Sequence, residues 1–301
     1  MREQVSKRHR QLLIAATVMT YMLVTLGGIV CVTNSSQGCP DWPGCYGQLI
    51  PPLRLDSIIE YTHRLIAALT TPLIIATAVV SWWKTRLTRW LSWPPIIAVM
   101  LAFAVIVFGA FAVLTGLPPG VAAIDLGAAL MVLALMVVAS VVACSYPNNP
   151  LVSNKISFRN PFAGLVLSTT IAVLIVFVSG VLVAESGSIV RCFGWPLYRA
   201  GFGDFSSQPV RHLVAAIAGV FIAIIIGRAW KTRHKHSAIF YTAATMGAVF
   251  LAEIGVGLLI PGSNFAFLLL IAYVALAALL WVLLVVLVVM AGIFDASAKK
   301  T

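Results

Sequence analysis

Charged residues are scarce in this sequence. Only 10% of its 301 residues are charged, nine are acidic, and 61% are hydrophobic. A soluble domain of this size normally has about 25% charged residues, so the composition excludes a water-soluble globular protein. The apolar runs are continuous rather than alternating, which indicates membrane-spanning helices instead of a β-barrel. Eight runs come near the roughly 20 residues that a spanning helix needs: 11–31, 58–83, 94–116, 121–143, 162–183, 209–228, 238–260 and 264–293.

Lysine and arginine are concentrated on one side of these predicted spans. They occur in the N-terminal tail, in alternate connections and at the C-terminal end, whereas the opposite connections hold Arg54, Arg191 and Arg199. Basic connections stay in the cytoplasm, so we expect a multi-pass protein of the cell membrane with both termini cytoplasmic. The net charge of +11 reflects this bias and attraction to anionic lipid. It does not indicate a nucleic-acid partner.

Two of the five cysteines lie close together in the first outer connection. Cys39 and Cys45 are six residues apart in "GCPDWPGC", where Pro and Gly favour a turn. In an oxidising exterior they can form a disulfide or a redox-active pair; two free thiols are the alternative. Cys31, Cys144 and Cys192 are interpreted as ordinary small apolar or loop residues.

An internal repeat divides the chain. The stretch "GIVCVTNSSQGCPDWPGCYG" (28–47) aligns with "GVLVAESGSIVRCFGWPLYR" (180–199), and both contain Cys-x-x-Trp-Pro. A histidine follows in the next predicted span of each half, His63 in the first and His212 in the second. The same four-helix plan is therefore expected twice.

The repeat predicts the fold class and its organisation. We expect an all-α integral membrane protein of eight transmembrane helices, arranged as two four-helix bundles with a pseudo-two-fold axis along the membrane normal. The N-terminal bundle is assigned to 1–144 and the C-terminal bundle to 162–301. A polar cytoplasmic linker at 145–161 joins them.

Ionisable residues inside the predicted spans share one depth. A proton path needs polar groups at several depths, so a single layer favours a site for a large amphipathic molecule, and no buried ionisable group is expected at the inner ends. Glu253 is expected to form a structural ion pair with Arg211, with a protonated carboxyl as the alternative. The residues of the outer layer are Glu60, His63, Arg64, Asp125, Arg211, His212 and Glu253.

Glu60, His63 and Arg64 lie on one face of the second span, at i, i+3 and i+4. One interpretation is an ion pair near the helix end, with His63 as an interfacial side chain. The other is heme ligation, because an imidazole inside a four-helix bundle is a common ligand of heme iron. The recurrence of the histidine as His212 favours iron ligation by both.

Several stretches together resemble the heme A synthase family. They are "LVTLGGIV", "GCPDWPGCYGQLIPP" and "SIIEYTHRLIA", with a weaker likeness in "CFGWPLY" and "RHLVAAIAG". The specific part is the combination of an outer Cys pair with Glu-x-x-His-Arg at the start of the second span. The resemblance covers most of the chain and is strongest across 24–70.

The resemblance implies an oxidoreductase that converts a methyl group of heme o to a formyl group, giving heme a, by successive oxygen-dependent steps. The N-terminal half would hold the substrate heme and the C-terminal half a heme b. His63 resembles a ligand of the substrate iron, Glu60 the essential carboxylate, and His212 a ligand of the second heme. Cys39 and Cys45 are similar to the loop disulfide of the family, which is thought to assist heme handling.

The sequence departs from the family at three positions. The family has a second His in its fourth and eighth spans, where this chain has Asp125 and Ile271, and a second Cys where it has Tyr198. A heme iron with one His keeps an open face for oxygen. Asp125 is then predicted to be a hydrogen-bonding or proton-relay residue. Its charge would be compensated by Arg64 or Arg211, which are also predicted to bind heme.

Other functions stay open at this point. The missing histidines also suit a non-catalytic heme b-binding protein for electron transfer or heme delivery, or a degenerate transport or assembly scaffold. A further alternative is that His63 and His212 bind one heme together. The expected partners are the lipid bilayer, heme o synthase and the terminal oxidase assembly, with a homo-oligomer also considered.

Overall fold

Eight long helices account for most of the computed structural model of this chain. The model describes residues 5–48, 50–115, 118–145, 156, 160–183, 191–195, 208–263 and 266–298. Among these residues there is no strand, only an isolated β-bridge between Cys45 and Gln48. Eight helices are long and apolar enough to span a membrane, which confirms the predicted all-α membrane fold. They are α1 (Lys7–Val32), α2 (Leu55–Thr85), α3 (Arg89–Thr115), α4 (Pro119–Ser145), α5 (Pro161–Val183), α6 (Gln208–Lys231), α7 (Ser237–Leu259) and α8 (Phe267–Ala298), with a short 3₁₀ turn, η3 (Pro261–Ser263), before α8.

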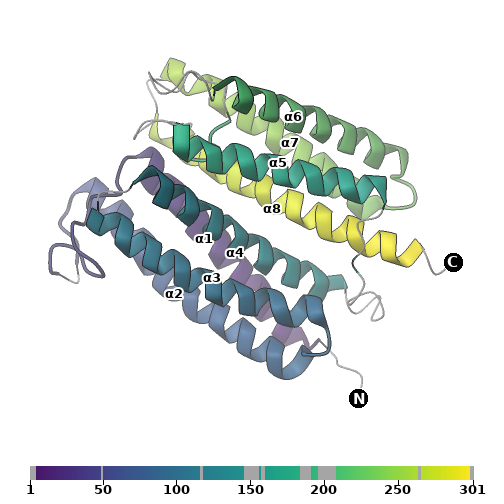
Figure 1. Cartoon of the computed structure of the whole chain (residues 1–301), viewed down its shortest axis with the longest axis horizontal. Helices are drawn as coiled ribbons and strands as arrows, with labels where there is room; N and C mark the ends of the chain where they lie inside the picture. Colours follow the sequence, from purple (N-terminus) through teal and green to yellow (C-terminus); the bar gives the residue numbers. More distant parts are fainter. Residues whose placement is uncertain are drawn as a thin grey trace.

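The helices form two four-helix groups that lie side by side (Figure 1). In the first group α1 contacts α2 and α4, and α3 contacts α2 and α4, so α2 and α4 lie at opposite corners. The same cycle of neighbours recurs among α5, α6, α7 and α8, and the two groups meet through α1, α4, α5 and α8. The pseudo-two-fold axis itself stays a prediction.

Local sequence signals explain where several helices begin. Ser6 caps α1 by accepting a hydrogen bond from the backbone N–H of His9. Asn160 does the same for Phe162, and Pro161 occupies the first position of α5, where its missing N–H costs nothing. The predicted linker at 145–161 lies almost entirely outside the described residues.

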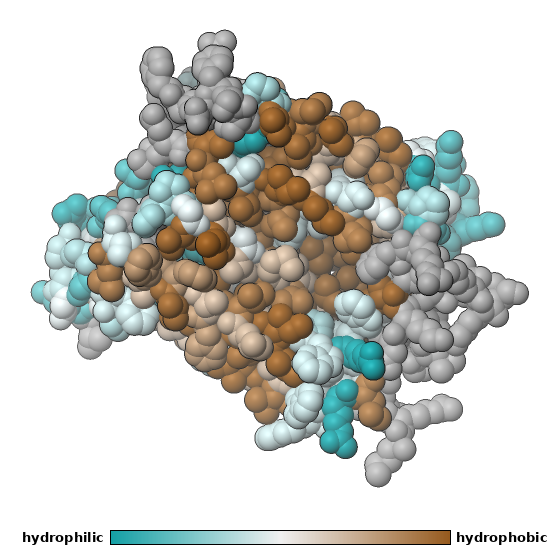
Figure 2. Space-filling view, in the orientation of Figure 1, coloured by the Kyte–Doolittle hydropathy of each residue, from teal (hydrophilic) through white to brown (hydrophobic). Residues whose placement is uncertain are grey.

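Polar and apolar residues are distributed as a bilayer requires. Figure 2 shows hydrophobic side chains across the middle of the visible face, with hydrophilic residues gathered toward the two ends of the helices. The start of α1 and the end of α8 lie at the same end of the helices, and we call the opposite end, which carries the first long connection, the outer end (Figure 1). The chain is therefore a multi-pass membrane protein.

The two halves differ in how their interiors are packed. The larger hydrophobic core runs through the C-terminal half from end to end, including Phe177 and Trp195 near the outer end, and extends onto α1 and α4. The smaller core belongs to the N-terminal half. Its members there, such as Leu13, Ile74 and Leu91, come from the inner half of the bundle. Among the described residues, the outer interior of the N-terminal half has no such core.

A disulfide between Cys31 and Cys192 joins the two halves at the outer end, so the interpretation of both as unpaired residues was wrong. The Sγ–Sγ distance is 2.03 Å and the partners are 161 residues apart in sequence. The tertiary packing of α1 against the segment after α5 creates this pair. Spacing along the chain does not indicate it.

The expectation that no ionisable residue is buried at the inner ends was also wrong. His9 is 2% exposed, and its Nε2 lies 3.0 Å from Ser81 Oγ on α2. Helix α1 begins at Lys7, four residues before the predicted span at 11–31. His9 therefore belongs to the packed helix rather than to a solvated tail.

The cross-link predicts that the halves stay joined after cleavage. With a protease site placed in the linker between α4 and α5, the cleaved protein should migrate as one species on a non-reducing gel and as two after reduction. Cys31→Ser should separate under both conditions, whereas Cys39→Ser should behave like the parent. Separation of the cleaved parent without reductant would contradict the Cys31–Cys192 bond.

Candidate functional site

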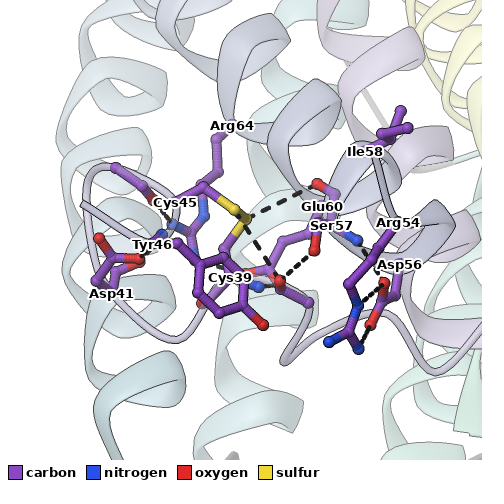
Figure 3. The surroundings of a disulfide bond; sticks show 12 residues. Cys39, Asp41, Cys45, Tyr46, Arg54, Asp56, Ser57, Ile58, Glu60 and Arg64 are labelled. Carbon is purple, nitrogen blue, oxygen red and sulfur yellow. Dashed lines mark hydrogen bonds and ion pairs between the residues drawn. A yellow bond between two sulfur atoms is a disulfide. The ribbon is translucent and has the colours of Figure 1, made fainter. Parts of the chain in front are cut away.

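The first outer connection is closed by the predicted disulfide between Cys39 and Cys45 (Figure 3). The Sγ–Sγ distance is 1.97 Å and both cysteines are fully buried. The loop packs against the start of α2, where Ser57 Oγ donates to the carbonyl of Gly38 at 2.6 Å. Because both sulfur atoms are buried, this arrangement suits a structural disulfide better than one that exchanges with thiols in solution.

Arg64 joins this loop to α2 (Figure 3). Its guanidinium donates to the backbone carbonyls of Cys39, at 3.1 Å, of Asp41, at 2.6 Å, and of Gly44. It also forms an ion pair with Glu60, one helical turn away. Four acceptors therefore surround one cation, which confirms the ion-pair interpretation of this part of the motif and adds the loop to it.

The Glu60 carboxylate is held on both oxygens. Oε1 accepts from Arg64, and Oε2 accepts from the backbone N–H of Cys39 at 2.9 Å. Glu60 is 4% exposed. A buried charge needs a counter-charge and hydrogen bonds to offset its desolvation, and both come from Arg64 and the disulfide loop. The geometry of the loop therefore determines the position of Glu60.

Asp41 caps the tip of the same loop. Its Oδ1 and Oδ2 accept from the backbone N–H groups of Tyr46 and Gly47, both at 2.6 Å. The Gly47 and Tyr46 hydrogen bonds hold the pKa of the Asp41 carboxyl below its usual value. The cap is therefore kept in the charged form that accepts both bonds.

His63 lies at the next turn of α2 and faces α1. A Cβ atom added at Gly27 would lie 3.3 Å from His63 Cε1, so the ring packs closely against the backbone of α1. His63 Nδ1 is buried and has no hydrogen-bond partner. A buried ring nitrogen without a partner is costly, which marks this imidazole as one that can take a ligand.

Asp125 lies on α4, at the corner opposite α2. Its Oδ1 is buried and has no hydrogen-bond partner. The predicted compensation by Arg64 or Arg211 was wrong, because the hydrogen bonds of both guanidinium groups go elsewhere. Asp125 and His63 therefore contribute two unsatisfied polar atoms to the half in which the described residues form no hydrophobic core at the outer end.

Arg211 and Glu253 do not form the ion pair that we expected. Arg211 donates to Ser179 Oγ, Val176 O and Gly194 O at 3.0, 3.0 and 3.1 Å. Both carboxylate oxygens of Glu253 are buried without a hydrogen-bond partner. Arg211 instead donates a hydrogen bond to the backbone of the segment 191–195, at Gly194. The spacing of residues along the sequence did not indicate this contact.

His212 is adjacent to Arg211 but its side chain is exposed. The positions that face the core from α6 are Arg211, Ala218, Ile222, Ile225 and Ala229, and His212 is about 100° around the helix from Arg211. Tyr198, which stands where the family has a second cysteine, lies outside the described residues.

Sequence reasoning missed the roles of Gly27 and Trp195. The sequence did not single out Gly27, because its contact with His63 depends on how α1 and α2 pack. Trp195 is 4% exposed, whereas Trp42, its counterpart in the repeat, is 45% exposed. The repeat indicated that both positions matter, but not that one tryptophan lies inside and the other outside.

The fold and the site define an eight-span helical membrane protein with a buried Glu–Arg pair and a histidine beneath an outer disulfide loop. The family model for the cytochrome oxidase assembly protein COX15-CtaA matches residues 10–59 and 54–285. The chain belongs to this family.

Curated relatives agree with this assignment. The chain is 27% identical over 270 residues to the heme A synthase of Alkalihalophilus pseudofirmus, covering 86% of this chain and 88% of that one. It is 28% identical over 235 residues to the heme A synthase of Halalkalibacterium halodurans, covering 75% and 78%. It is 32% identical over 198 residues to the heme A synthase of Bacillus pumilus, covering 62% of each.

The buried pair predicts a strong coupling between Glu60 and Arg64. Glu60→Gln and Arg64→Met should each lower the free energy of unfolding by about 3–5 kcal/mol, because each leaves one buried charge unpaired. The double variant should lose less than the sum of the two. Denaturant unfolding in detergent, followed by circular dichroism, measures all four corners of the cycle.

A second Arg–carboxylate pair supplies the control. Arg54 and Asp56 also form an ion pair, but their side chains are 63% and 35% exposed. Neutralising them should have little measurable effect. Equal losses at the two pairs, or strict additivity at Glu60 and Arg64, would contradict the buried clamp.

Proposed function

We propose that this protein oxidises a methyl group of heme o to the formyl group of heme a, with the substrate held by His63 in the N-terminal half. Family membership and the heme A synthase relatives support the broader assignment. The chain is an oxidoreductase of heme A biosynthesis, which serves cytochrome oxidase assembly. In this proposal heme o synthase supplies the substrate and the terminal oxidase receives the product.

The single observation that carries the proposal is the state of His63. Its Nδ1 is buried and unpartnered, and Gly27 lets the ring lie against α1. The residues that the structure describes form no hydrophobic core in the outer interior of this half. A neutral imidazole in such a place suits the iron of a porphyrin. Among the described residues no three His, Cys, Asp or Glu side chains gather around a metal position.

Glu60 and its partners lie one helical turn outward from His63. Arg64 and the Cys39 N–H hold the carboxylate in one orientation, which favours a fixed acceptor beside the reacting edge of the substrate. A charge held by preorganised donors needs no reorganisation when charge develops nearby. Glu60 is proposed to orient the reacting substituent and accept a proton during its oxidation.

Asp125 is proposed to complete the polar lining from α4. Its Oδ1 has no partner within the protein, so it is available to hydrogen-bond with the substrate or with water. An aspartate stands where the family has its second histidine, so His63 would hold the substrate iron in this half without a second imidazole, and the iron would supply oxygen chemistry when the substrate is bound. Asp125 would pass protons to this side of the substrate.

Loss of the imidazole should remove both heme and product. His63→Ala should give protein without the heme of the N-terminal half and without heme a, when co-expressed with a source of heme o. Pigment extraction with chromatographic separation of heme o, heme a and protoheme measures both. His9→Asn is the matched control, because it also removes a buried imidazole from this half yet should keep both. Full turnover by His63→Ala would contradict the proposal.

Loss of the Glu60 charge should separate binding from chemistry. Glu60→Gln should retain heme but accumulate heme o or a partly oxidised product, because the amide cannot accept the proton. Glu253→Gln neutralises a buried carboxyl of the other half and should form heme a normally. Wild-type product levels in Glu60→Gln would show that the carboxylate is only structural, and absence of heme from it would show that Glu60 acts in binding.

A further inference from the structure

Trp195 is buried at the outer end of the C-terminal half, where it and the preceding Gly194 contact all four helices. Its ring centroid is 6.4 Å from that of Phe177 on α5 and 5.0 Å from that of Phe250 on α7. Its backbone N–H donates to the hydroxyl of Tyr273 on α8 at 2.9 Å. The preceding carbonyl, of Gly194, accepts from Arg211 on α6. The tryptophan therefore fills the middle of the bundle.

The segment 191–195 is fastened at its other end to the N-terminal half. Cys192 forms the disulfide with Cys31 at the end of α1. The next residue, Phe193, is 2% exposed and packs edge-on against Phe177 with ring centroids 5.7 Å apart. A Cβ at Gly28 would lie 2.8 Å from Phe193 Cε2, so only glycine fits on α1 there. These contacts hold Trp195 inside.

This filled region is at the level where the resemblance predicts a heme b. The predicted ligand positions are His212, next to Arg211, and Ile271, two residues from Tyr273. Arg211 and Tyr273 both hydrogen-bond to the backbone around Trp195. The aromatic cluster thus lies at the same level along the helices as the two positions. Of these, His212 has an exposed side chain and Ile271 has no metal-binding atom.

The buried polar atoms here do not indicate a porphyrin. Arg211 Nη1, Trp195 Nε1 and the carboxylate oxygens of Glu253 have no hydrogen-bond partner within the protein. A few ordered waters satisfy such groups, since a water needs only a small polar space. A porphyrin needs a flat space across the bundle, which Trp195, Phe177 and Tyr273 occupy with exposures of 4% or less.

The N-terminal half has the opposite arrangement. Its repeated Cys-x-x-Trp-Pro closes on itself through Cys39–Cys45, and Trp42 remains 45% exposed on the loop. No tryptophan of the loop therefore enters that bundle, and His63 and Asp125 keep unsatisfied polar atoms inside it. The same repeated motif therefore places its tryptophan outside the bundle in one half and inside the bundle in the other.

We propose that the segment 191–195, held by the Cys31–Cys192 disulfide, closes the C-terminal half to heme, so that the chain carries one heme, bound by His63. The identity of that heme as heme o or heme a rests on the proposed function, whereas the number of hemes and their location do not. The C-terminal half then serves as a packed support for the N-terminal half.

Heme stoichiometry with the full-length chain tests this directly. Pyridine hemochrome absorbance per mole of purified protein from heme-replete cells should give one heme per chain. His212→Gln should keep this ratio unchanged, whereas His63→Gln should lower it at least tenfold. Both substitutions keep a polar side chain of similar length, so misfolding does not confuse the comparison.

Other outcomes of this measurement would contradict the proposal. Two hemes per chain, or a ratio that falls by half in His212→Gln, overturns the proposal. Colourless parent protein also overturns it, because the N-terminal half would then hold no heme. One heme per chain without any heme a contradicts the proposed oxidation alone.

Peptide mapping without reduction should recover Cys31 linked to Cys192. Recovery of Cys192 as a free thiol would overturn the proposal, because the disulfide holds the segment 191–195 in place.

Discussion

The outer end of the N-terminal half depends on the buried ion pair between Glu60 and Arg64. Two charges in a low-dielectric interior are stable only if their remaining hydrogen-bonding capacity is also satisfied. Here the satisfaction comes from the loop: Arg64 donates to three of its carbonyls, and the N–H of Cys39 donates to Glu60. The helix and the loop therefore cannot be changed independently. The disulfide matters because it keeps the loop in the shape that these charges need.

The two Cys-x-x-Trp-Pro segments differ in the partner of their first cysteine and in the burial of their tryptophan. Cys39 finds its partner six residues away, which keeps the first loop compact and outside. Cys192 finds its partner on α1, across the boundary between the halves. The second segment is thereby drawn down between the helices, where Phe193 and Trp195 become core residues.

The features that could be predicted from the sequence are those set by the bilayer or by near neighbours along the chain. Continuous apolar runs predicted eight spans because hydrocarbon leaves helices as the solution for each of them. The Cys39–Cys45 and Glu60–Arg64 pairs are local, six and four residues apart, so their spacing indicated them. The Cys31–Cys192 bond, the burial of His9 and the partners of Arg211 join residues on different elements. Helix rotation and loop path decide these contacts, and one sequence without a structure specifies neither.

Buried polar atoms without hydrogen-bond partners lower stability, and dense packing elsewhere in a protein offsets part of that cost. Proteins commonly keep functional sites at a cost in stability, and here the cost falls on the outer N-terminal interior, where His63 and Asp125 keep unpartnered atoms. The large core of the C-terminal half extends onto α1 and α4, two of the four helices that surround that interior. The cross-link at Cys31 fastens α1 at the same end as the site. Dense packing in one half thus supports α1 and α4, two of the helices that surround His63 and Asp125.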